Sequence, residues 1–199
     1  MLTKLKRRVQ SWMAAEAGAV HRLGLTPNHV SAVGITLALA SGFAYWLSGD
    51  DGVFLVVAPL LLLASGFCDA LDGVLARLYG EATTFGGFLD SLLDRYADAA
   101  LIFGIWAGGL CDFQSAFLAA LGSLLVSYTR ARAEGLGIDL AGVGLAERAE
   151  RLATLVLASW IALAWEGALE LGLLILVFMT HMTAAQRAAH AFLALRSGA

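Results

Sequence analysis

Long apolar segments separated by short polar turns are the feature that most constrains this chain. Of its 199 residues, 59% are hydrophobic, and its mean hydropathy is +0.76. An ordinary soluble domain has only about 45–50% apolar residues. Since about 20 apolar residues cross a bilayer, we predict six transmembrane helices, over residues 26–47, 53–77, 85–108, 115–129, 147–165 and 168–195. The sequence therefore predicts an all-α integral membrane protein.

Residues 1–25 are expected to lie on the membrane rather than cross it. Lys4, Lys6 and Arg7 stand among apolar side chains, and Trp12 follows them, as in an amphipathic helix at a membrane surface. A cleaved signal peptide is the alternative, but Glu16 and a histidine interrupt its apolar core. We therefore expect an interfacial amphipathic helix over residues 1–25 and one six-helix domain over residues 26–199.

Charge is distributed unevenly between the two ends of these predicted helices. Lys and Arg gather at the N-terminus, in the second-to-third and fourth-to-fifth connections, and near the C-terminus. The three opposite turns and the residues beside them hold acids only: Asp50, Asp51, Asp112, Glu166 and Glu170. The positive-inside rule then places both termini in the cytoplasm, in a multi-pass protein of the cell membrane. Because the basic residues follow membrane topology, we expect no nucleic-acid partner.

Four carboxylates stand inside this apolar sequence. Asp69 and Asp72 are three residues apart on one predicted helix, and Asp90 and Asp94 are four apart on the next, so each pair shares one helix face. Ionisable groups at membrane depth are costly and usually functional. Oxygen ligands from two helices suit a hard divalent cation. A buried ion-pair network or the cation pathway of a transporter is the alternative.

Arginines are expected at the same membrane face as the carboxylates. The planar fork of Arg77 suits a phosphate, and four more arginines lie in or beside the fourth-to-fifth connection: Arg130, Arg132, Arg148 and Arg151. Together with a metal site they predict a place for polyanions, open to the cytoplasm. For each arginine, a solvated loop obeying the positive-inside rule is the alternative. Asp98, one turn beyond Asp94, is expected to support the site or to bond a neighbouring helix.

Residues 69–94 also fit the pattern D-x2-D-G-x2-A-R-x8-G-x3-D-x3-D without departure. This pattern resembles the signature of the CDP-alcohol phosphatidyltransferases, the membrane enzymes of phospholipid headgroup synthesis. The resemblance implies that two Mg²⁺ or Mn²⁺ ions are held by Asp69, Asp72, Asp90 and Asp94, with Asp94 also the general base. It implies CDP-lipid contacts from Asn28, Ser31, Gly73, Arg77, Thr83 and Gly86.

The second substrate is suggested by residues 127–134 and 147–151. They are similar to the acceptor side of phosphatidylinositol phosphate synthases, above all archaeal ones that make archaetidylinositol phosphate, although relatives often carry lysine where Arg130 stands. The resemblance implies transfer from CDP-diacylglycerol or CDP-archaeol to inositol 1-phosphate, with release of CMP, by a homodimer. The acceptor phosphate would be bound by Arg130, Arg132, Arg148 and Arg151. Glycerol 3-phosphate as acceptor, or a transporter, is the alternative.

Overall fold

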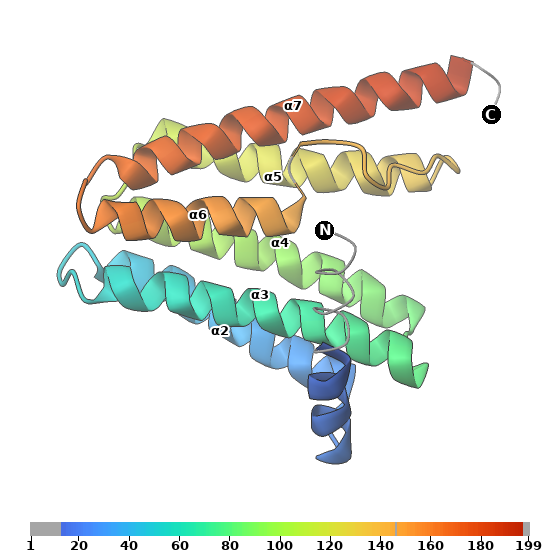
Figure 1. The fold of residues 1–199 in the computed structure, drawn as a ribbon. Helices are drawn as coiled ribbons and strands as arrows, with labels where there is room; N and C mark the ends of the chain where they lie inside the picture. Colours follow the sequence, from blue (N-terminus) through green and yellow to red (C-terminus); the bar gives the residue numbers. More distant parts are fainter. Residues whose placement is uncertain (1–12, 146, 197–199) are drawn as a thin grey trace, which may run out of the picture.

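The protein is a bundle of long helices in the computed structural model, which describes residues 13–145 and 147–196 (Figure 1). These residues contain helices and loops and no strand, so the predicted all-α fold is confirmed. A helical segment over residues 13–22 comes first. The long helices follow in chain order: α2 (Pro27–Leu47), α3 (Phe54–Tyr79), α4 (Thr84–Ala107), α5 (Phe113–Glu134), α6 (Arg148–Ala162) and α7 (Ala168–Arg196).

The helix bounds differ from the expected ones mainly in α5 and α6. Helix α5 continues beyond the predicted end at Thr129 to Glu134, because neither glycine nor proline lies between Thr129 and Gly135. Arg130 and Arg132 are therefore helical residues. Helix α6 ends at Ala162, and the chain then turns before α7 begins.

Three of the described helices, α2, α3 and α7, are long and apolar enough to cross a membrane by length and composition. Helix α4 carries four charged residues between Asp90 and Asp98, and α6 has only 15 residues. Large apolar side chains such as Phe43, Leu60 and Phe178 are exposed on the outer surface of the bundle. Composition therefore identifies a membrane protein, while the count of six crossings stays a prediction.

The six helices form two halves. Helices α2, α3 and α4 pack together as the first half, and α7 packs against α5 and α6 in the second. Contacts of α3 with α6 and of α4 with α5 join the halves. Figure 1 shows the first half below and the second half above, with the helices running roughly alongside one another. A site formed between the halves can thus combine side chains from both.

The main buried cluster joins all six helices near the turns opposite the carboxylates. It includes Tyr45, whose hydroxyl lies 2.6 Å from Ser159 Oγ and so links α2 to α6. Gly42 and Gly104 let α2 and α4 touch, because a Cβ at Gly104 would overlap the carbonyl of Gly42. Small residues allow such close helix approach in membranes. The bundle is therefore tightly packed at this end, and the two cavities described below lie at the other.

The segment 13–22 crosses the ends of α2 and α3 instead of running along them (Figure 1). Ala17 is buried against Val30, Leu71 and Leu75, and the His21 ring stacks on Tyr79 with ring centroids 3.6 Å apart. Residues 1–12, the first part of the amphipathic helix predicted over residues 1–25, lie outside the described residues.

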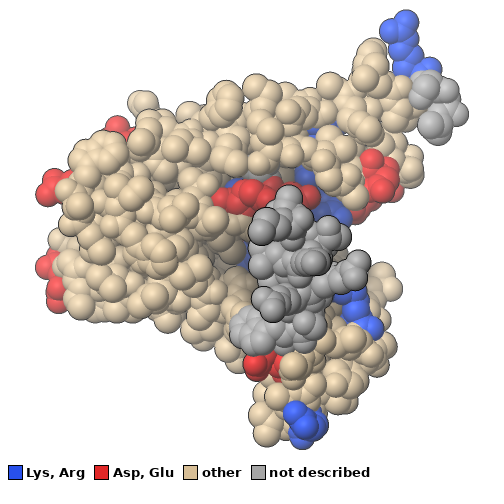
Figure 2. Space-filling view, viewed as in Figure 1, with Lys and Arg blue, Asp and Glu red and all other residues tan. Residues whose placement is uncertain are grey.

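Opposite charges gather at opposite ends of the bundle. Figure 2 shows acidic residues and no Lys or Arg on the visible left-hand end, which is formed by the α2–α3, α4–α5 and α6–α7 turns. Lys and Arg appear on the right, where the surface is hollowed between the two halves and acidic atoms line the hollow. This distribution agrees with the segregation seen in the sequence.

Candidate functional site

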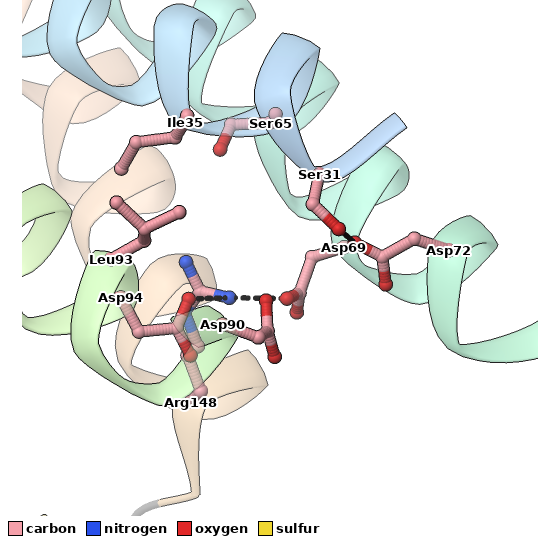
Figure 3. Close-up of a pocket in the computed structure, with 10 residues that line it drawn as sticks. Ser31, Ile35, Ser65, Asp69, Asp72, Asp90, Leu93, Asp94 and Arg148 are labelled. Atoms are coloured by element: carbon pink, nitrogen blue, oxygen red, sulfur yellow. Dashed lines mark hydrogen bonds and ion pairs between the residues drawn. The ribbon is translucent and has the colours of Figure 1, made fainter. Parts of the chain in front are cut away.

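Three of the predicted metal ligands converge between α3 and α4. One oxygen from each of Asp69, Asp72 and Asp90 lies within 4.8 Å of the other two. The i, i+3 spacing on α3 turns its two carboxylates towards α4, whose Asp90 faces them (Figure 3). Three carboxylate oxygens at this separation fit a Ca²⁺-, Mg²⁺- or Mn²⁺-like cation. The donor set therefore fits the predicted divalent metal.

Asp94 lies one turn beyond Asp90 and lines the same small cavity. Its Oδ1 is 2.7 Å from Nη1 of Arg148, which is also 2.6 Å from Asp69 Oδ1. Figure 3 shows the guanidinium of α6 between the two carboxylates. The structure thus places Asp94 beside the three-carboxylate group, in contact with an arginine predicted to bind the acceptor.

Ser31 joins α2 to this group. Its hydroxyl donates to Asp72 Oδ2 at 2.5 Å, and the Asp72 residue is only 8% exposed. A carboxylate buried so far needs a hydrogen-bond donor or a cation. Ser31, expected at the CDP-lipid, therefore also orients a metal-ligating candidate.

The other residues expected at the CDP-lipid form two small groups at the same end of the bundle. Thr83 caps α4 by accepting a hydrogen bond from the Gly86 amide at 3.0 Å. A Cβ at Gly86 would lie 3.8 Å from Asn28 Oδ1, so the beginnings of α2 and α4 meet here. At Gly73, a Cβ would lie 3.3 Å from Arg77 Nη1, which shows that this guanidinium folds back over the glycine.

A second, larger cavity of about 790 Å³ opens between α4 and the second half. We call it the acceptor cavity, after the arginines predicted from the sequence to bind the acceptor. It shares Asp90, Asp94 and Arg148 with the small cavity. Five arginines line it: Arg95, Arg130, Arg148, Arg151 and Arg187. Arg132 is exposed and is not among the described residues that line the cavity, because it points to a different face of α5.

The cavity arginines differ in how firmly they are held. Arg151 is buried, and its Nη1 donates to Asp98 Oδ2 at 3.1 Å. That bond joins α6 to α4, as expected for Asp98. Arg187 is also buried and donates to the carbonyls of Val143 at 2.9 Å and Val126 at 2.5 Å. The exposed Arg130 pairs with Glu134, one turn along its own helix, at 2.8 Å.

Sequence reasoning missed Arg95 and Arg187. Both stand inside predicted apolar spans, where an isolated cation is itself a sign of function. Arg95 directly follows Asp94, and Arg187 lies in the last third of the long apolar helix α7. That rule, applied to every charged residue of the spans, would have found both.

Comparison with known proteins finds relatives that match almost the whole chain. The family model for CDP-alcohol phosphatidyltransferase matches residues 24–194. An archaetidylinositol phosphate synthase of Pyrococcus horikoshii is 35% identical over 94% of each chain, and one of Methanothermobacter thermautotrophicus is 41% identical over 83% of each.

The phosphatidylinositol phosphate synthase of Mycobacterium tuberculosis has a similar fold. Its structure with CDP-DAG has a TM-score of 0.78 and 27% identity, covering 90% of this chain and 93% of that one. Its complex with manganese and citrate also has a TM-score of 0.78, at 28% identity, covering 90% and 88%. The chain therefore belongs to the CDP-alcohol phosphatidyltransferase family.

Proposed function

We propose that this enzyme transfers the phosphatidyl or archaetidyl group of a CDP-lipid to inositol 1-phosphate and releases CMP. The observation that carries the proposal is the pair of adjoining cavities, one lined by carboxylates and one by arginines, which share Asp90, Asp94 and Arg148. The names of the similar synthases and the CDP-DAG complex of the mycobacterial one support it.

The carboxylates would hold the metal. Asp69, Asp72 and Asp90, with Asp94 beside them, are proposed to bind two Mg²⁺ or Mn²⁺ ions. When bound, such ions offset the negative charge of a pyrophosphate and stabilise the leaving phosphate. The manganese complex of the mycobacterial relative supports this choice of metal.

The chain's own residues would bind and orient the substrates and accept the proton that is transferred. Asn28, Ser31, Gly73, Arg77, Thr83 and Gly86 are proposed to contact the CDP-lipid. The carboxylate of Asp94 accepts the proton of the acceptor hydroxyl while that oxygen bonds to the lipid-bearing phosphorus. The bond from this phosphorus to the bridging oxygen breaks, and CMP leaves with the electron pair. A base within hydrogen-bond reach of the hydroxyl suffices for this step.

The arginines of the acceptor cavity would hold the phosphate of inositol 1-phosphate. Guanidinium groups bind phosphate with two parallel hydrogen bonds. Arg130, Arg148 and Arg151 are proposed for this role, joined by Arg187, which lines the same cavity. Arg132 lies outside that lining, so its position supports a role in the site less well.

All six long helices are proposed to cross the cell membrane, with both termini and both cavities on the cytoplasmic side. The segregation of charge supports this orientation (Figure 2). Asp90, Asp94 and Arg95 of α4 line the cavities, and Asp98 is paired with Arg151 of α6. These charged side chains are therefore compatible with a membrane crossing by α4. Residues 1–25 would lie in the interface, since segment 13–22 runs across the bundle. We further propose a homodimer, which light scattering of the detergent-solubilised protein checks.

An acceptor competition tests the proposed function. Membranes containing the protein, a CDP-lipid and Mn²⁺ are given inositol 1-phosphate, inositol, glycerol 3-phosphate or serine, and CMP release is measured. We expect release with inositol 1-phosphate to exceed release with the others. Preference for glycerol 3-phosphate would reassign the acceptor, and absence of CMP with every acceptor would reject the reaction.

A further inference from the structure

Arg95 differs from the other arginines of the acceptor cavity in the half of the bundle that carries it. Of the five described arginines that line this cavity, it alone comes from the first half, on α4; the others belong to α5, α6 and α7. It directly follows the proposed general base Asp94, and about a fifth of its side chain is exposed. Its position makes it a candidate link between the two halves.

Its guanidinium contacts both halves at once. Nη1 donates to Ser127 Oγ on α5. Nη2 lies 3.7 Å from Asp94 Oδ2 and 3.6 Å from Asp98 Oδ2 on its own helix. The Ser127 hydroxyl donates its proton to the carbonyl of Ser123, so its oxygen is left to accept from Arg95. The contact therefore has a defined donor and acceptor.

Asp94 consequently has a guanidinium near each of its oxygens. Arg148 contacts Oδ1, and Arg95 approaches Oδ2. Arg148 is also proposed to bind the acceptor phosphate, and that task competes with its contact to Asp94. Arg95 is anchored to Ser127 instead, so it can hold the carboxylate while substrate is bound.

We propose that Arg95 is a positioning residue, which fixes the carboxylate of Asp94 relative to the α5 wall of the acceptor cavity. The inference rests on the proposed function. In that function the carboxylate that takes the proton, Asp94, belongs to the first half, and the arginines that bind the phosphate of inositol 1-phosphate belong to the second. The planar fork reaches two carboxylates and Ser127 together, and the single ammonium of a lysine does not reproduce these directions. A misplacement of about 1 Å at a reacting group can cost about 10²-fold in rate.

The test compares Arg95→Lys, Ser127→Ala and the double variant in lipid nanodiscs. Arg22→Lys is the matched control, since Arg22 is exposed and donates to the carbonyl of Gly18 on its own helical segment. We measure kcat and KM with inositol 1-phosphate, the affinity for CDP-lipid, Mn²⁺ binding and thermal unfolding. We expect Arg95→Lys to lower kcat at least about tenfold and Ser127→Ala to lower it less, by about three- to fivefold. The affinity for CDP-lipid and the binding of Mn²⁺ stay within about twofold of wild type.

The double variant distinguishes positioning from a general loss of structure. If Arg95 acts through Ser127, the double variant has nearly the kcat of Arg95→Lys alone, because coupled residues are not additive. The proposal is overturned if Arg95→Lys keeps wild-type kcat, if the two effects multiply, or if CDP-lipid affinity falls together with kcat. Should Arg95→Lys fail to fold, unchanged kcat in Ser127→Ala overturns it equally.

Failure of the proposed function gives a different result. A wild-type protein that releases CMP with another acceptor rejects inositol 1-phosphate alone, and the same variants are then compared with that acceptor. A wild-type protein that releases CMP with none rejects the reaction and the positioning role together.

Discussion

The two halves of the bundle have three long helices each but opposite chemistry at the end where they part. The first half supplies the carboxylates of α3 and α4, and the second supplies four of the five cavity arginines. This arrangement offers one surface suited to a cation and one suited to a phosphate, and Arg148 contacts the carboxylates where the two surfaces meet. A reaction that joins a metal-bound pyrophosphate to a phosphorylated alcohol needs both surfaces side by side.

The halves also differ in how they are joined along their length. At the far turns they meet through buried apolar side chains and the Tyr45–Ser159 hydrogen bond. Near the cavities they meet through charged groups such as Arg148 with Asp94 and Arg151 with Asp98. Packing therefore fixes the bundle at one end, while polar contacts set the geometry at the other. Four predictions test this contrast, from the largest effect on activity to the smallest.

Removing the metal, or one carboxylate of the first half, should abolish activity. We expect EDTA to reduce CMP release to background, and Mn²⁺ or Mg²⁺ to restore it. Asp69→Asn should lose Mn²⁺ binding, seen by electron paramagnetic resonance, because one of three converging oxygens no longer carries charge. Asp50→Asn, an exposed acid of the opposite turns, is the control. Full activity in EDTA would contradict the proposed metal site.

Asp94→Asn should lower kcat by about 10³-fold, within the range of general-base catalysis. An amide does not accept the proton of the acceptor hydroxyl, although its size is almost the same. Single-turnover CMP release measures the effect, and a CDP-lipid binding assay should show nearly unchanged affinity. A variant that keeps wild-type kcat would exclude Asp94 as the base.

Arg130→Gln should weaken acceptor binding without changing metal binding. Loss of one exposed charge-assisted hydrogen bond to phosphate should raise KM for inositol 1-phosphate by about five- to tenfold. Arg132→Gln is the matched comparison, two residues further along α5 but outside the cavity lining, and we expect less than about a twofold change. Equal effects of the two substitutions would show that overall charge, not cavity position, matters.

Gly104→Ala should affect stability and leave activity nearly unchanged. The added methyl would overlap the carbonyl of Gly42 and push α2 from α4, lowering the free energy of unfolding by about 1–3 kcal/mol. Thermal unfolding in detergent checks the shift. Gly52→Ala, where a Cβ meets no atom within 4 Å, should unfold like wild type. A large loss of kcat in folded Gly104→Ala would show that the packed end controls the site.

Much of the fold was predictable because hydropathy and turn residues act locally. Thr26 and Pro27 mark the beginning of α2, and Gly80 with positive φ ends α3 close to the expected place. The grouping of Asp69, Asp72 and Asp90 also follows from local helix spacing, once the two helices are taken as neighbours.

The acceptor cavity was harder to predict because its residues come from four helices. Periodicity does not say which face of α5 meets α4, so Arg130 and Arg132 were indistinguishable in sequence. The contacts of Arg95 with Ser127 and of Arg187 with Val143 depend on how distant segments pack. Such long-range contacts leave no repeating signal in the chain.

The row Asp94, Arg95, Asp98 and Arg151 alternates in sign and carries no net charge. It therefore contributes little long-range attraction for an incoming dianion, despite holding two guanidinium groups. Arg130 and Arg148 are likewise paired with carboxylates, whereas Arg187 donates to backbone carbonyls. Electrostatic capture of the soluble substrate from the cytoplasm therefore falls mainly to Arg187, and the salt dependence of the association rate should follow this position rather than the total number of arginines.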